Sequence, residues 1–175
     1  MIRAADNADG KDFTLLLQFD MGMDGFASDW AYCDRLSSYM AKMVSHNRAD
    51  SILYSNLLSS ALNELLETAF RQHHAGGDLL CSISRSGARD RVELTIPSDG
   101  DISGFYQDAI ARLSHAGVVE EYRNALFAEG PLTNDIGLME LAVDYGAQLS
   151  VEQLGDHSLR LVAEFALEET HSDAQ

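Results

Sequence analysis

The chain has 175 residues, 46% of them hydrophobic, which is enough for one domain with a sizeable core and leaves little room for a second. Its 28 acidic and 12 basic residues give a formal net charge of -16, so phosphate backbones and anionic membranes would be repelled and nucleic-acid binding is not expected. No run approaches the roughly 18 apolar residues of a membrane span, and no apolar secretory core precedes residue 11, so we expect a cytoplasmic protein.

The polar, small-residue stretches at the two ends predict flexible tails over residues 1–11 and 169–175, on either side of a single domain over 12–168. The two cysteines, Cys33 and Cys81, lie far apart in apolar segments and lack the spacing of a metal site. We expect buried free thiols in a reducing compartment.

Hydrophobic periodicity predicts the elements of the first half of the chain. Phe13, Leu15, Leu17 and Phe19 are expected to share one face of the first strand, and Ser51 to cap a long helix. In chain order, the patterns predict a strand over 13–19, helices over 29–46 and 51–72, and strands over 78–84 and 91–96 joined by a hairpin loop over 85–90.

In the second half, residues 98–130 have a helical pattern that glycines interrupt. A further helix is capped by Thr133 or Asn134 and ends at Gly146, before two strands over 148–153 and 159–167. The order β-α-α-β-β-α-α-β-β predicts an α+β fold, a two-layer sandwich in which helices cover one face of a mixed, mostly antiparallel sheet.

Two local motifs stand out in this order. The helix segment from Ala61 to Arg71 places Glu64 and Thr68 one turn apart on the same helical face. The segment Ile136-Gly137-Leu138-Met139-Glu140-Leu141-Ala142-Val143-Asp144-Tyr145-Gly146-Ala147-Gln148-Leu149 begins a helix with Gly-Leu and runs through a Tyr-Gly-Ala turn into a strand.

Together, the element order and the two motifs resemble the GHKL (Bergerat-fold) ATPase superfamily, which includes histidine-kinase catalytic domains and anti-sigma-factor serine kinases. The resemblance spans roughly residues 13 to 167. A closer likeness is to the small SiaB-like regulators of bacterial partner-switching operons. The resemblance implies a histidine-kinase-type ATPase fold for nearly the whole chain.

The resemblance also implies roles for two residues of the long helix. Glu64 falls where the superfamily has the glutamate that orients or deprotonates the attacking hydroxyl. Thr68 falls where it has the asparagine that holds Mg²⁺ on the ATP phosphates, which is a departure, because a hydroxyl is shorter than an amide. From the residues alone, Glu64 could equally be a solvated helix residue, and the Thr68 hydroxyl could simply bond to the carbonyl of Glu64.

The nucleotide motifs of the superfamily are reduced in this chain. Asp99 is the candidate partner of the adenine amino group, although a turn residue without a ligand is the favoured interpretation. Asn134, Gly137 and Leu138 mark the remainder of the phosphate loop, in which only one glycine is left. The cofactors implied are ATP and Mg²⁺, or none if the site is fully degenerate.

Three functions remain open. We favour a bacterial partner-switching regulator, a pseudokinase that binds a small protein of the STAS-like or anti-sigma-antagonist type. The alternatives are an active ATP-dependent serine/threonine protein kinase that phosphorylates such a partner, and a self-associating scaffold. The resemblance further implies that the helix over 29–46 lies at a homodimer or partner surface. No Gly-x-Ser-x-Gly elbow supports a hydrolase.

Overall fold

The computed structural model describes residues 12–73 and 75–168, so both predicted tails lie outside the described residues. Five strands form one antiparallel sheet in the order β1-β2-β3-β5-β4. They are β1 (Thr14–Gly22), β2 (Asp78–Ser86), β3 (Arg89–Pro97), β4 (Gln148–Gln153) and β5 (Ser158–Phe165).

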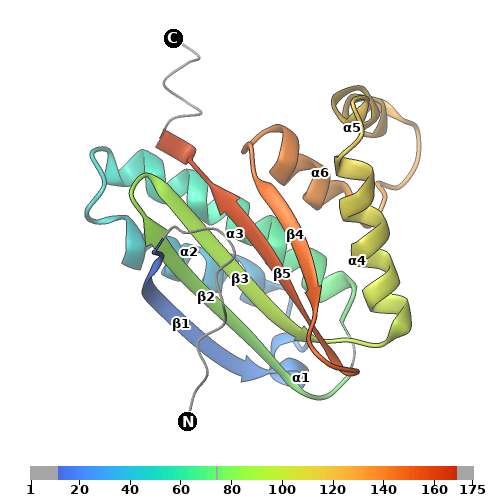
Figure 1. The fold of residues 1–175 in the computed structure, drawn as a ribbon, viewed down its shortest axis with the longest axis horizontal. Coiled ribbons are helices and arrows are strands. Elements are labelled where there is room, and N and C mark those ends of the chain that lie inside the picture. The colour runs from blue at the N-terminus through green and yellow to red at the C-terminus, as the bar shows by residue number, and fades with distance from the viewer. Residues whose placement is uncertain (1–11, 74, 169–175) are drawn as a thin grey trace.

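Helices cover one face of this sheet, as the sequence predicts (Figure 1). Helices α2 and α3 pack along each other behind the strands, α4 lies beside β4, and α6 lies between α3 and α5. The helices are α1 (Met23–Phe26), α2 (Ala31–Ser45), α3 (Ser51–Arg71), α4 (Gly100–Leu113), α5 (Val118–Phe127) and α6 (Ile136–Val143). The α+β two-layer class is therefore confirmed, and every strand pairing in the described residues is antiparallel.

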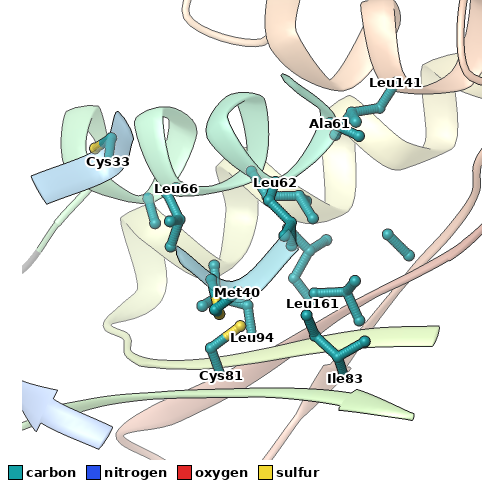
Figure 2. Packing of buried hydrophobic residues seen from close by; sticks show 14 of the residues in the cluster. Cys33, Met40, Ala61, Leu62, Leu66, Cys81, Ile83, Leu94, Leu141 and Leu161 are labelled. Atoms are coloured by element: carbon teal, nitrogen blue, oxygen red, sulfur yellow. The ribbon is translucent and has the colours of Figure 1, made fainter. Parts of the chain in front are cut away.

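The core lies between the sheet and the two long helices (Figure 2). Met40 of α2 and Leu62 and Leu66 of α3 face the inner side chains of the strands, among them Cys81 and Leu94. Buried and partly exposed side chains alternate strictly in β3 and β5, so one face of each strand is buried. Each large apolar side chain that is removed from water in this way stabilises the fold by about 1.5–3 kcal/mol. Both cysteines are free and buried, as predicted.

The first strand differs from the prediction in its phase. A register shift between Leu15 and Leu17 marks a β-bulge, and a bulge moves the following residues to the other face. Leu17, Phe19 and Met21 therefore pack on the core, whereas Leu15 stays 57% exposed.

Three further boundaries are corrected by the structure. Asp50 rather than Ser51 is the N-cap of α3, because its carboxylate accepts the Leu53 N–H at 2.9 Å. The predicted hairpin loop over 85–90 is mostly strand, with Gly87 at a φ of +60° in the turn. The helical stretch over 98–130 is divided into α4 and α5.

A buried ionic cluster explains why the hairpin ends stay paired. The wholly buried carboxylate of Asp90 accepts from Arg85 Nε at 2.6 Å and from Arg48 at 3.1 Å, and the Tyr54 hydroxyl donates to it as well. Arg85 also donates to the Val44 carbonyl at 3.0 Å. The cluster therefore ties the β2–β3 hairpin to α2, to the turn after it and to α3.

Candidate functional site

A polar cleft opens where α3 meets α6, and we call it the α3–α6 cleft. It measures about 270 Å³ and is lined by Asp34, Ser59, Ser60, Asn63, Glu64, Glu140 and Tyr145. The lining residues of α3 lie on its polar side, which faces away from the sheet. The amphipathic pattern that buries the apolar side of α3 in the core therefore also places these polar groups in the cleft.

Glu64 is the predicted site residue that lines this cleft. Its side chain is partly buried, and loss of solvent raises its pKa from the ordinary 4.5 to about 7. The neighbouring carboxylates of Glu140 and Glu67 contribute to this rise in pKa, while the Arg71 guanidinium opposes it. A carboxyl with a pKa near neutrality can exchange a proton at physiological pH, which is the property required of a general base.

The rest of the cleft is acidic as well. Burial raises the pKa of Glu140, and the carboxylates of Asp144 and Glu67 add to the effect. Arg71 forms an ion pair with Glu67 at 2.8 Å, and no arginine or lysine is among the described residues that line the cleft. The described lining of the cleft is therefore acidic, and Arg71 beside it is paired with Glu67.

Gly137 brings α6 into direct contact with α3. A Cβ atom at this position would lie 2.8 Å from Oε2 at the movable end of Glu64 and 3.1 Å from Oγ1 of the buried Thr68, so glycine permits this close approach. The start of α6 therefore packs against Glu64 and Thr68, the two residues that the first sequence motif indicated. The structure brings Glu64, Thr68 and Gly137 together, although they come from two motifs far apart in the sequence.

Thr68 is wholly buried beneath this contact, and its hydroxyl donates to the Glu64 carbonyl at 2.8 Å. This is the intrahelical bond that the sequence left open as the alternative to a metal role. Within residues 12–73 and 75–168, no group of three or more His, Cys, Asp or Glu side chains is arranged to hold a metal ion.

The other predicted site residues lie outside the cleft lining. Asp99 is the N-cap of α4 and accepts the Ile102 N–H at 2.9 Å. Asn134 is exposed in the turn before α6, and Leu138 is buried in the core. Next to Asn134, Asp135 is buried and forms an ion pair with Arg112.

Residues that the sequence analysis did not select complete the cleft. Glu140 and Tyr145 stand within the Gly-Leu motif and follow Gly137 along it, so the motif contained them without indicating their role. Asp34 enters from α2, and no local pattern in its own helix relates it to Glu64. Such residues become neighbours only through the packing of three helices.

This arrangement is a poor fit to magnesium-bound ATP. The Thr68 hydroxyl is buried and already donates to a carbonyl, α6 lies against Glu64, and the cleft lining offers carboxylates rather than cations to a triphosphate. Nucleotide binding stays a prediction that a direct measurement must decide.

Comparisons with known proteins agree with the fold. No family model and no curated protein matches the chain. A chain in the crystal structure of the SiaB–SiaC complex from Pseudomonas aeruginosa is similar, with a TM-score of 0.50 at 11% sequence identity over 86% of this chain and 89% of that chain. At this identity the similarity shows the fold alone, so the superfamily motifs stay predictions.

The helices show no sign of a membrane segment. Among the described residues, none combines the length and the apolar character that crossing a bilayer requires.

Proposed function

We propose that the protein is a bacterial, cytoplasmic signalling regulator of the partner-switching type. It binds a small regulatory protein, of the STAS-like or anti-sigma-antagonist kind, through a kinase-like domain with eroded ATP-binding motifs. The fold similarity supports this proposal, because it extends over most of both chains and the similar chain belongs to a complex of two proteins.

The observation that carries the proposal is the contact at Gly137. The start of α6 lies on Glu64 and Thr68, where the superfamily would place Mg²⁺ and the phosphates, and the cleft around it is acidic. This contact and the acidic lining disfavour a bound nucleotide, and they therefore favour recognition of a protein partner over phosphate transfer.

The runner-up is an active serine/threonine protein kinase, and one observation favours it. Glu64 lines the cleft with its pKa raised to about 7, so it is suited to accept the proton of a hydroxyl on a partner protein. In a kinase this residue would act as the general base, and catalysis would require α6 to sit differently on α3. A self-associating scaffold is the third function, and it predicts no exchange of partners.

Calorimetry with purified STAS-like proteins of the source bacterium tests the proposal. We expect one of them to bind saturably without nucleotide. A serine-to-aspartate change at its phosphorylation site should alter the affinity, since partner switching requires the phosphorylated and unmodified forms to bind differently. If none of these proteins binds at up to millimolar concentration, the proposed partner class is wrong.

Glu64→Gln separates the regulator from the kinase. A kinase predicts phosphate transfer to the partner that this variant abolishes while nucleotide binding is retained. If the protein is a regulator, neither the wild type nor the Glu64→Gln variant transfers phosphate, and both bind the partner with equal affinity. Glu140→Gln, which removes a charge from the same cleft, is the matched control.

A further inference from the structure

Helix α2 carries a row of exposed polar and aromatic side chains on the side away from the core. Arg35, Tyr39, Lys42 and His46 recur at four, three and four residues, which places them on one helical face, and we call them the basic stripe. All four are exposed, with Tyr39 at 60%.

Within the described residues, the cations of the stripe form no ion pair. In the described part of the chain, seven arginines form ion pairs: Arg48, Arg71, Arg85, Arg89, Arg91, Arg112 and Arg160. Arg35, Lys42 and Arg123 form none, and two of these three lie on the stripe. In a chain with a net charge of -16, cations left unpaired on one helix face are available to an external carboxylate.

A groove runs beside the stripe, between the end of α2 and the start of α3. It measures about 280 Å³, and the described residues that line it include no carboxylate: Lys42, Ser45, His46, Ser51, Ile52, Ser55 and Asn56. Ile52 is 75% exposed at this groove, and Met43, next to Lys42 on α2, is 50% exposed. The groove is large enough for an aliphatic side chain and has apolar surface to contact it.

We propose that the basic stripe and this groove dock an acidic amphipathic helix of a partner protein. Arg35 and Lys42 are separated by seven residues, or about 10 Å along α2, so they match two carboxylates two helical turns apart. The groove lies one turn beyond Lys42 along α2, so an apolar side chain one turn beyond the carboxylate that meets Lys42 would enter it against Ile52. This inference rests on the proposed function, because it assigns the surface that a regulatory protein uses.

A second copy of the chain is a poor occupant of this surface. A symmetric pair would place Arg35 and Lys42 opposite the same residues of the other copy, and each copy also carries a net charge of -16. An acidic partner meets the same overall repulsion, but screening limits it to about 8 Å at physiological ionic strength. The local contact with the stripe therefore decides the interaction.

The test is fluorescence anisotropy with a labelled helical peptide that has two glutamates seven residues apart and a leucine one helical turn outside each of them. We expect saturable binding that weakens with added salt, and much weaker binding of the matched peptide with glutamines in place of the glutamates. Lys42→Glu should weaken binding roughly fivefold or more, because it turns an attraction into a repulsion. Arg123→Glu, the matched control, reverses an unpaired exposed charge on α5 and should leave the affinity unchanged.

Several results would overturn the inference. These are absence of saturable binding at millimolar peptide, equal binding of the glutamine peptide, or equal weakening by Lys42→Glu and Arg123→Glu. Light scattering that shows a dimer of the wild type and a monomer of the Lys42→Glu variant would assign the surface to a second copy instead. If a STAS-like protein binds the wild type and the Lys42→Glu variant with equal affinity, the basic stripe is not the docking surface, although the proposed function still holds.

Discussion

Gly137 is the residue on which the contact between α3 and α6 depends. Gly137→Ala should lower the free energy of unfolding by about 1–3 kcal/mol, because the new methyl group meets Glu64 Oε2 at 2.8 Å and Thr68 Oγ1 at 3.1 Å. This figure is the net change, after the roughly 1 kcal/mol that alanine usually adds to stability within a helix. Urea unfolding followed by circular dichroism measures the change.

Gly104→Ala is the control for this prediction. Gly104 lies within α4 and has nothing within 4 Å of an added Cβ atom, so alanine should stabilise the protein there. If both variants respond alike, α6 does not rest on Glu64 and Thr68 in the way described.

The raised pKa of Glu64 makes a prediction about pH. The folded protein holds a proton on this carboxyl up to about pH 7, whereas the unfolded chain releases it near the ordinary 4.5. Folding therefore binds protons between these values, and its stability falls as the pH rises from about 4.5 to 7. Melting temperatures of the wild type should decline over this window, and those of Glu64→Gln should decline less.

The exposed Glu120→Gln on α5 is the comparison for this series, since it removes a carboxylate outside the cleft. If the melting temperature declines with pH as steeply in Glu64→Gln as in the wild type, the Glu64 carboxyl titrates near its ordinary pKa.

At the same scale, the sequence indicated part of the site. The i, i+4 spacing singled out Glu64 and Thr68, and the Gly-Leu motif singled out Gly137, and these three residues do meet. Asp34 and Glu140 were missed, because a carboxylate on a solvated helix face looks the same whether or not another helix approaches it. Proximity between elements has no local signal in the chain.

The buried Asp90 cluster holds several elements together and gives a prediction at that scale. Asp90→Asn should cost about 3–5 kcal/mol of unfolding free energy, because it leaves two guanidinium groups near a neutral amide in a buried setting. Chemical denaturation measures the loss. Asp20→Asn, on an exposed part of β1, should change the stability by less than about 0.5 kcal/mol, and an equally small effect of Asp90→Asn would contradict the role of the cluster.

The elements themselves were largely predictable. Val92, Leu94 and Ile96 alternate strictly, and α3 carries a continuous apolar stripe, so their periodicities are clear. The errors fall where tertiary structure overrides the local pattern. The bulge in β1 shifts Leu15 out of the core, and pairing of Arg85 with Asp90 converts most of a predicted loop into strand.

For the whole molecule, element order alone led to the correct fold class. It could not identify the function, because one fold carries many functions and the residues that distinguish them converge only in space. The α3–α6 cleft and the basic stripe illustrate the point. Helix packing assembles the cleft and leaves the stripe exposed. The cleft is an acidic region and the stripe is a cationic region, on a chain whose net charge is -16.

The central proposal is that this protein works as a regulator without nucleotide. Calorimetric titration of the purified protein with ATP and with ADP, from micromolar to millimolar concentration and with or without Mg²⁺, tests it most directly. We predict no saturable heat in any of these titrations, because α6 lies against Glu64 and Thr68. Saturable binding that Mg²⁺ strengthens would contradict the account and establish the kinase as the better interpretation.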